Sequence, residues 1–324
     1  MRFSIGIPAF KSAFIKECID SILIQTYREF ELIIINDASP DPIDNIINSY
    51  RDNRIQYIKN EKNVGAEKVV MNWNKCLAQA NGDYFILMGD DDKLEPTYLE
   101  QFDKLIKNYP ELDVFHCRSK IIDEYSKVKA ITPSWPEYES VFDNIWHRIN
   151  GFRLQYISDF VYKTRPLKKN GGFYYIPLAW GSDDITAYRQ AGNKGIAHTN
   201  ICLLNYRNSP ITISNSGNAN LKLLAIQEEM KWFNTFINSS KPSGTDLTVL
   251  NQIKYLLPAY FSSKKKNTLI SALKDNFFNG VSLSVKGIRN KRILPKEGLS
   301  AMLTVLKFKT KNFILFKKRN TILL

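Results

Sequence analysis

The first 110 residues alternate short, nearly uninterrupted apolar runs with longer segments in which apolar residues recur at helical spacing. The apolar runs are "FSIGI", "LIII" and "YFILM", at residues 3–7, 32–35 and 84–88. A strand that is covered on both faces reads as such a run, and the segments between the runs are long enough for a helix and its loops. The pattern therefore predicts an α/β domain with a Rossmann-like, mostly parallel sheet flanked by helices.

Polar residues follow each of these apolar runs. Pro8 follows the first, Asp37 the second, and Asp90, Asp91 and Asp92 the third. Ligands bind at the carboxyl ends of the strands in such sheets, so the three loops are expected to meet at one crevice. Adjacent carboxylates repel each other and are costly to desolvate. An exposed acidic turn would avoid that cost, but the convergence of three loops favours a divalent cation that shares carboxylate and phosphate oxygens.

A second informative stretch is "GGFYYIPLAWGSDD", at residues 171–184. Its two glycines and its aromatic residues precede the pair Asp183–Asp184, and "DITAYRQAG" then reads as a helix. Acidic side chains are favoured near the positive end of a helix dipole. Residues 133–156 are rich in aromatics, and their pattern assigns no element.

These stretches together resemble the inverting glycosyltransferases of family 2, of the bacterial polysaccharide-biosynthesis type. Five segments follow that family's motifs in order: "FSIGIPAF", "ELIIINDASPD", "NEKNVGAEKVVMNWNKCLAQANGDYFILMGDDDKLEP", "GGFYYIPLAWGSDD" and "NYRNSPITIS". The resemblance covers about residues 2–215 and implies a GT-A fold. It also implies transfer of a sugar from a nucleotide-diphosphate donor, expected to be UDP-linked, to a saccharide or lipid-linked acceptor in surface polysaccharide or lipopolysaccharide synthesis.

On the donor side, the resemblance assigns the three aspartates to a metal site for Mn²⁺ or Mg²⁺. A cation stabilises the charge that develops on a departing diphosphate. The family's D-x-D motif departs slightly here, because its first Asp aligns with Gly89. Asp91 is the preferred ligand by alignment, with Asp90 and Asp92 as rivals, and one of the three is expected to bind the ribose or a basic residue instead.

The remaining nucleotide-binding positions also follow from the resemblance. They are Pro8, Ala9, Phe10, Asp37, Asp90, Lys68 and Arg207. Asp37 would accept a hydrogen bond from the uracil ring, the alternative being a helix cap. Lys68 would contact a phosphate, or else lie in solvent, and Arg207 would pair with the diphosphate. The histidine of the family's last motif falls at Asn208 or Ser209 and is missing here, while His198 is expected to be structural.

On the acceptor side, inversion needs one base that removes the proton of the attacking hydroxyl. The family's base aligns with Asp184. Asp183 stands where the family has Glu, so the assignment stays open between the two aspartates, and Asp183 could instead cap the helix. Trp180 would stack on a sugar ring or belong to the core, and Gly172 and Phe173 are the other acceptor-binding positions implied.

The net charge of +13 is concentrated at the carboxyl end, where residues 254–324 hold 16 Lys and Arg against two acids. We therefore expect a catalytic domain at residues 1–215 and a basic, mainly helical extension at 216–324. The mixture of basic and apolar residues in 254–324 suits an anionic membrane surface, or a helical extension that packs on the main domain. No nucleic-acid-binding motif is recognisable, so no nucleic-acid partner is expected.

The sequence also bears on compartment and on rival functions. It shows no signal peptide, no run of about 18 apolar residues and no paired-cysteine spacing, which predicts reduced thiols and a cytoplasmic protein, peripheral at the inner face of the membrane. The sequence contains neither a G-x-G-x-x-G nor a G-x-x-x-x-G-K-[ST] loop. A Rossmann dehydrogenase and a P-loop enzyme are therefore not expected. A sugar nucleotidyltransferase would carry a glycine-rich basic first loop, which "IPAFKSAF" lacks. An inactive sugar- or membrane-binding module is the other alternative, but the acidic residues it would have lost are present.

Overall fold

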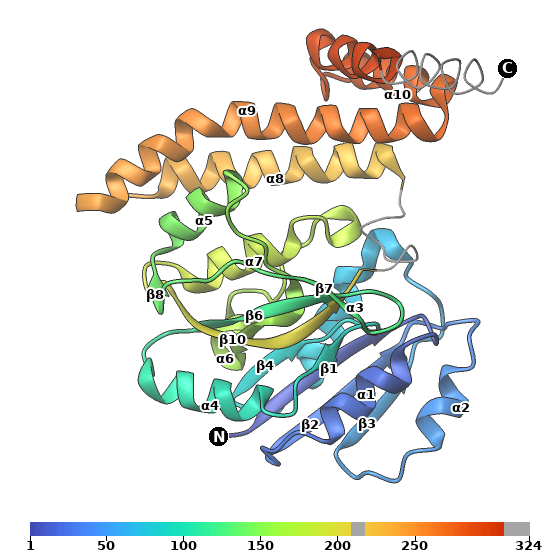
Figure 1. Cartoon of the computed structure of the whole chain (residues 1–324), viewed down its shortest axis with the longest axis vertical. Helices are drawn as coiled ribbons and strands as arrows, with labels where there is room; N and C mark the ends of the chain where they lie inside the picture. The colour runs from blue at the N-terminus through green and yellow to red at the C-terminus, as the bar shows by residue number, and fades with distance from the viewer. Residues whose placement is uncertain (209–217, 308–324) are drawn as a thin grey trace, which may run out of the picture. The chain divides into compact units, whose positions relative to one another are not determined.

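The computed structural model describes residues 1–208 and 218–307. Its first half is the parallel arrangement that the apolar runs predict, with strand order β3-β2-β1-β4 (Figure 1). The strands of this half are β1 (Phe3–Ala9), β2 (Phe30–Asn36), β3 (Ile55–Lys59) and β4 (Tyr84–Leu87). The helical segments between them are α1 (Ile15–Leu23), α2 (Ile43–Asn48), the 3₁₀ turn η1 (Ala66–Lys68) and α3 (Val69–Gln79).

Close packing between helix and sheet sets the geometry of this half. Helix α1 buries Ile15, Cys18, Ile19 and Ile22, the spacing of a single apolar face. Helix α3 lies so close to β1 that a Cβ atom on Gly6 would come within 2.6 Å of the Cys76 Cβ. The carboxyl ends of β1, β2 and β4 are thereby held together at one edge.

The second half makes the sheet mixed. Strand β9 pairs antiparallel with both β4 and β6, β10 runs parallel to β6, and β5 pairs antiparallel with β10. The strands here are β5 (Lys93–Leu94), β6 (Val114–Ile122), β7 (Val128–Ile131), β8 (Tyr138–Glu139), β9 (Phe160–Lys163) and β10 (Ile196–Arg207). The helical segments are α4 (Tyr98–Asn108), α5 (Val141–Ile149), η2 (Ile157–Asp159), α6 (Thr164–Lys169), η3 (Pro177–Ala179) and α7 (Ser182–Ala191).

The chain divides into two compact units, residues 1–216 with 240–253 and residues 217–239 with 254–324. The helical extension expected from the sequence is present as α8 (Ala219–Ser239), α9 (Gly244–Asp275), α10 (Phe277–Arg289) and a further helical stretch at residues 295–307. Within the second unit, Lys264 of α9 forms an ion pair of 2.5 Å with the buried Glu229 of α8. The expected boundary at residues 215 and 216, Ser209, and the last residues of the basic tail lie outside the described residues.

Within residues 1–208 and 218–307, no helix has both the length and the apolar character that a membrane span requires.

Candidate active site

The acidic residues after β4 are held by backbone and hydroxyl donors from three distant segments. Asp90 Oδ2 accepts hydrogen bonds from the backbone N–H groups of Phe10 (2.8 Å) and Lys11 (2.9 Å), just after β1. Asp92 Oδ1 accepts one from the backbone N–H of Arg207 (2.9 Å). The predicted convergence of the β1 and β4 loops is therefore observed, and the end of β10 joins them.

Asp91 differs from its two neighbours. Its carboxylate accepts no hydrogen bond from any residue that the structure describes, and it is half-buried. Burial and then the charge of Asp90 raise the pKa of Asp91 to about 6. Burial also raises the pKa values of Asp90 and Asp92. The cluster is thus short of positive charge, and Asp91 carries the carboxylate with the most unused acceptor capacity.

Gly89 leaves room beside these carboxylates. A Cβ atom at Gly89 would lie 2.9 Å from Asp92 Oδ2 and 3.2 Å from Asp91 Oδ1, so two carboxylates approach the same point. Among the described residues, no three His, Cys, Asp or Glu side chains are placed to hold a metal by themselves. These residues fit a cation such as Mg²⁺ or Mn²⁺ that takes one or two carboxylates and completes its shell with substrate phosphates.

Asp37 follows β2 and faces the same edge of the sheet. It is 6% exposed, and its Oδ1 accepts hydrogen bonds from Asn60 Nδ2 (2.8 Å) and the Val64 N–H (3.0 Å). Its Oδ2 forms no hydrogen bond within the described part of the chain. Helix α2 has Pro42 at its N-cap and no side-chain cap, so the helix-cap alternative for Asp37 is wrong. One oxygen of Asp37 stays available for a ligand.

The other donor-side positions differ in exposure. Ala9 is fully buried, Pro8 is half-buried, and Phe10 is 40% exposed beside Asp90. Lys68 is exposed at the junction between η1 and α3. The structure thus brings Phe10 to the carboxylate cluster, and it ties Asp37 to the same loop through the hydrogen bond from the Asp37 N–H to the Ala9 carbonyl oxygen at 2.9 Å. The Ala9 side chain is buried, and Lys68 lies in solvent.

Arg207 occupies a different place from the one expected for a diphosphate ligand. Its side chain is fully buried and stacks on the ring of Phe14, 4.1 Å from the ring centroid. All three guanidinium nitrogens donate to the protein, to the carbonyl oxygens of Asp91, Asp123 and Glu124, to Ser126 Oγ and to Glu17 Oε2. This arrangement argues against diphosphate contact and for a role in fixing the loop that carries the acidic cluster.

The acidic pair begins helix α7. Asp184 is 7% exposed, and both of its carboxylate oxygens accept hydrogen bonds from Arg148 Nε, at 3.2 and 3.1 Å. Gln155 Nε2 donates a further hydrogen bond to Asp184 Oδ1 at 2.7 Å. Gly181 occupies the N-cap position, so the helix-cap alternative for Asp183 is wrong. Asp184 is therefore held as an oriented, charge-paired carboxylate.

Asp183 lies in a different electrostatic environment. It forms no ion pair with any described residue. Burial and the charge of Asp184 raise the pKa of Asp183 to about 7, against the smaller opposing effect of Arg148. Asp183 is thus a carboxyl group that titrates near neutrality, next to an Asp184 that is paired with Arg148.

The turn before this pair is strained. Leu178 and Ala179 have φ values of 62° and 54°, in the left-handed region, and Gly181 has φ 110°. Such conformations cost free energy in residues other than glycine and are often found at functional sites. Trp180, half-buried, lies within this turn. The turn therefore fixes where Trp180 and the acidic pair are presented.

Gly172 and Phe173 are packing residues in this structure. Phe173 is 2% exposed and contacts the rings of Trp73, Phe85 and Tyr162. Gly172 has φ +73°, and a Cβ atom there would lie 2.2 Å from Asn74 Oδ1. Their burial argues against the acceptor contact expected for them and explains the residue types by close packing and backbone conformation.

Three residues that the sequence did not single out contact the candidate carboxylates. Arg148 and Gln155 bind Asp184, and Ser158 Oγ donates to Asp92 Oδ2 at 3.1 Å. They belong to or adjoin the aromatic-rich stretch that has no clear period, and an isolated Arg, Gln or Ser gives no local signal of its role. The helical start of α5, with Ser140 as N-cap, was the only feature there that a capping pattern could have revealed.

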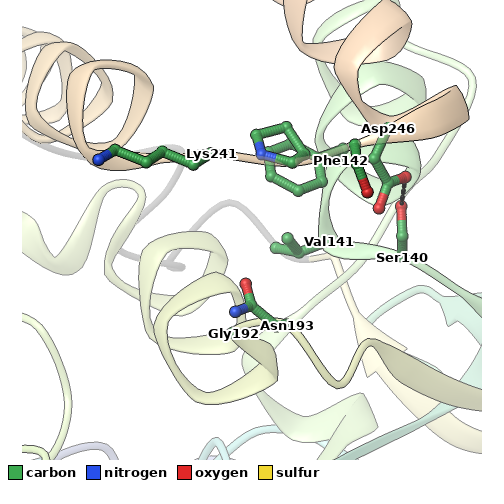
Figure 2. Close-up of a pocket in the computed structure, with 9 residues that line it drawn as sticks. Ser140, Val141, Phe142, Gly192, Asn193, Lys241 and Asp246 are labelled. Atoms are coloured by element: carbon green, nitrogen blue, oxygen red, sulfur yellow. Dashed lines mark hydrogen bonds between the residues drawn. The ribbon is translucent and has the colours of Figure 1, made fainter.

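A cavity of about 250 Å³ lies elsewhere on the first unit (Figure 2). It is lined by Ser140, Val141, Phe142, Gly192, Asn193, Lys241, Pro242, Ser243 and Asp246. The Ser140 hydroxyl donates to Asp246 Oδ1 at 2.7 Å on one side of this cavity. None of the sequence-predicted site residues lines it, so the carboxylate clusters and not this cavity define the candidate site.

Known proteins are similar in sequence to part of this chain. The putative glycosyltransferase EpsE of Bacillus subtilis is 34% identical over 125 residues, which are 37% of this chain and 44% of EpsE. An uncharacterized glycosyltransferase of Rickettsia typhi is 31% identical over 125 residues, 38% of each chain. The match therefore spans less than half the length of these relatives.

Solved structures share the fold at low sequence identity. S. aureus TarS 1-349 in complex with UDP-GlcNAc has a TM-score of 0.65 at 16% identity, over 96% of this chain and 92% of that chain. The mannosyltransferase PcManGT from Pyrobaculum calidifontis, in complex with GDP-Man and Mn²⁺, has a TM-score of 0.54 at 16% identity, over 94% and 87%. The expected α/β fold of the GT-A type is thereby confirmed. Since residues 4–182, more than half of the chain, also match the family model for glycosyl transferase family 2, the chain belongs to that family.

Proposed function

We propose that this protein transfers a sugar from a UDP-linked donor to a hydroxyl of a saccharide or lipid-linked acceptor, with inversion at the anomeric carbon. The observation that carries the proposal is the presence of two separate carboxylate sets, Asp90–Asp92 at the end of β4 and Asp183–Asp184 at the start of α7. One set suits a charged diphosphate with its cation, and the other suits removal of a proton. The nucleotide sugars bound to the structural neighbours support the same class of donor.

The donor site would be built from the ends of β1, β2 and β4. Asp37 offers one carboxylate oxygen to the base, and Phe10 presents a half-exposed ring beside Asp90. Asp91 would hold the cation, with Asp92 as the nearest second ligand and Asp90 turned toward the backbone of Phe10 and Lys11. When bound, the cation supplies charge stabilisation for the leaving diphosphate.

The acceptor site would use the pair at α7. Arg148 and Gln155 orient the Asp184 carboxylate, so Asp184 is placed to take the proton of the acceptor hydroxyl. Asp183, with a pKa near 7, is partly protonated and would hydrogen-bond to the acceptor as a donor. Trp180 lies in the adjoining turn, where its ring would border the acceptor sugar.

Nucleotide binding provides the first test of the donor site. Purified protein with Mn²⁺ and UDP is expected to melt at a higher temperature than protein with either one alone, because a ligand that binds only the native state stabilises it. The Asp91→Asn variant should lose the part of the shift that requires Mn²⁺. A larger shift with GDP or dTDP would correct the donor but keep the reaction class, whereas no shift with any of the three would contradict a glycosyltransferase and favour a binding module.

We infer the pathway and the location from the second unit. Helical residues 295–307 expose Leu299, Leu303 and Leu306, at positions i, i+4 and i+7, while Ala301 and Val305 are buried. The only acid in residues 277–307 is the buried Glu297, which accepts a hydrogen bond from the Leu294 N–H. The exposed charged residues of 277–307 are all basic: Lys286, Arg289, Lys291, Lys296 and Lys307.

A surface of leucine and lysine suits an anionic membrane. That location would bring the enzyme to a lipid-linked acceptor in surface polysaccharide or lipopolysaccharide synthesis. We expect the full chain to sediment with vesicles containing phosphatidylglycerol, less so at high salt, and not with phosphatidylcholine alone. Replacing both Leu299 and Leu303 with Gln should weaken binding by about tenfold or more, since each leucine loses apolar burial in the bilayer.

The matched control for the vesicle experiment is Leu247→Gln. Leu247 is 46% exposed but belongs to the first unit. Equal loss of binding in the control and the double variant, or equal sedimentation with neutral vesicles, would contradict an anionic membrane surface at residues 295–307.

A further inference from the structure

The segment of residues 155–159 contacts both carboxylate sets. Gln155 Nε2 donates to Asp184 Oδ1 at 2.7 Å, and Ser158 Oγ donates to Asp92 Oδ2 at 3.1 Å. Both side chains are buried, at 2% and 0% exposure. We infer that this segment is a positioning element, which fixes the acceptor-side carboxylates relative to the donor-side carboxylates; the inference rests on the proposed function for the identity of the two sites.

Ser158 closes the turn that carries the acidic cluster. Its hydroxyl oxygen accepts a hydrogen bond from the Gly89 N–H at 3.0 Å while its proton is directed to Asp92. The Ser158 carbonyl oxygen is itself fixed by the hydroxyl of the buried Tyr98 at 3.0 Å. One serine therefore sets both the backbone of the turn and the orientation of the Asp92 carboxylate.

Asp159 anchors the segment to the centre of the sheet. Its Oδ2 accepts hydrogen bonds from the Tyr156 N–H (3.0 Å) and from Ser119 Oγ of β6 (3.1 Å). Its Oδ1 lies 3.3 Å from Nε2 of His116, also on β6, and both side chains are fully buried. Asp159 thus anchors the segment through buried contacts with β6. These contacts with the sheet oppose a shift of the segment at either end.

The donor-side and acceptor-side carboxylates are contacted by different residues of the segment, so the effect on each set can be tested separately. The Ser158 hydrogen bonds reach only the donor side, and the Gln155 hydrogen bond reaches only the acceptor side. Ser119 contacts neither set and acts through Asp159. Three substitutions can therefore address the donor end, the acceptor end and the anchor independently.

The donor end is tested with Ser158→Ala and the matched control Ser4→Ala. Ser4 is equally buried, and its hydroxyl likewise accepts from a backbone N–H, that of Gly82, and donates to a carboxylate, that of Glu31. Both variants should lower the melting temperature similarly. Only Ser158→Ala should weaken the binding of Mn²⁺ with UDP, by about tenfold or more, as loss of an outer-shell partner does in metal sites.

The acceptor end is tested by the pH dependence of stability in Gln155→Ala, with the equally buried Gln25→Ala as control. A carboxyl group with a raised pKa in the folded state contributes stability that is lost as pH rises through that pKa. Removing the hydrogen bond to Asp184 favours protonation of the pair. The loss of stability, which begins at the pKa of the unfolded carboxyl and is complete near pH 7 in the wild type, should therefore extend to higher pH. The groups that face the pair stay in place in both variants: Arg148, Asp159, Tyr162 and Tyr188.

Ser119→Ala tests the anchor, and we expect it to change both readouts, each by less than the variant at that end. The inference is overturned if Ser158→Ala weakens Mn²⁺–UDP binding no more than Ser4→Ala, if Gln155→Ala shifts the pH transition no more than Gln25→Ala, or if Ser119→Ala changes neither readout. If wild-type protein does not bind UDP, GDP or dTDP with Mn²⁺, the proposed donor site fails, while the pH experiment still decides whether the segment positions the acidic pair.

Discussion

Replacing Asp184 with Asn is expected to lower the rate of sugar transfer by about 10³-fold, within the range that a general base contributes. The substitution keeps the size of the side chain but removes the negative charge that accepts the proton. Donor binding should be nearly unchanged, because Asp184 contacts Arg148 and Gln155 and none of the donor-side carboxylates. Steady-state kinetics check this prediction: kcat should fall, and the KM for the donor should stay nearly the same.

Asp183→Asn is the companion variant to Asp184→Asn. We expect a smaller loss of rate, and we expect the dependence of the rate on pH near 7 to disappear, since the group whose pKa is raised to about 7 is gone. Asp113→Asn, on an aspartate paired with Lys163 and Lys194, serves as the control and should retain activity. A larger loss with Asp183→Asn than with Asp184→Asn would make Asp183 the base, and full activity in both variants would contradict the proposed mechanism.

Arg207→Ala is expected to reduce the free energy of unfolding by about 2–4 kcal/mol, since backbone carbonyl oxygens that lose their donor cost roughly 1–3 kcal/mol each. The variant would leave the carbonyl oxygens of Asp91 and Glu124 without the donor that Arg207 supplies, whereas that of Asp123 keeps the Ser126 N–H at 3.0 Å. Chemical denaturation measures the effect. Arg51→Ala, at an exposed position, is the control, and its effect should lie within about 0.5 kcal/mol.

The same variant distinguishes a structural arginine from a diphosphate ligand. If Arg207 holds the loop, Ala at this position should lower stability in the absence of any nucleotide. If instead Arg207 bound the diphosphate, the variant would keep its stability without nucleotide and lose only the stabilisation by UDP and Mn²⁺. The buried stacking of its guanidinium on Phe14 predicts the first result.

The parallel half of the fold could be predicted because each of its elements carries a strong local pattern. The run Leu32–Ile35 has no polar interruption, and Ile15, Cys18, Ile19 and Ile22 mark one face of a helix. Strand β9 could not be predicted, since "FVYK" is only four residues long and its position between β4 and β6 depends on contacts distant in sequence. The mixed character of the sheet therefore comes from tertiary pairing that no local pattern encodes.

In the candidate site too, some residues could be predicted from the sequence and others could not. Asp37, Asp90–Asp92 and the pair Asp183–Asp184 were identifiable because each follows an apolar run or lies in a segment that resembles a motif of the family. Their partners were not, because the roles of Gln155 and Ser158 exist only through contacts with residues 29 and 66 positions away. For Phe173 and Arg207 the sequence predicted too much. Their motif positions suggested contact with a ligand, but both side chains are buried and contact other parts of the protein.

Gly89 has a consequence for how this sequence can vary. A side chain at position 89 would bring its Cβ atom within 2.9 Å of Asp92 Oδ2 and 3.2 Å of Asp91 Oδ1, so both carboxylates would have to shift to admit it. Exchanging this glycine for the aspartate of the family's D-x-D motif would therefore add a fourth negative charge to the cluster and displace the carboxylates already there.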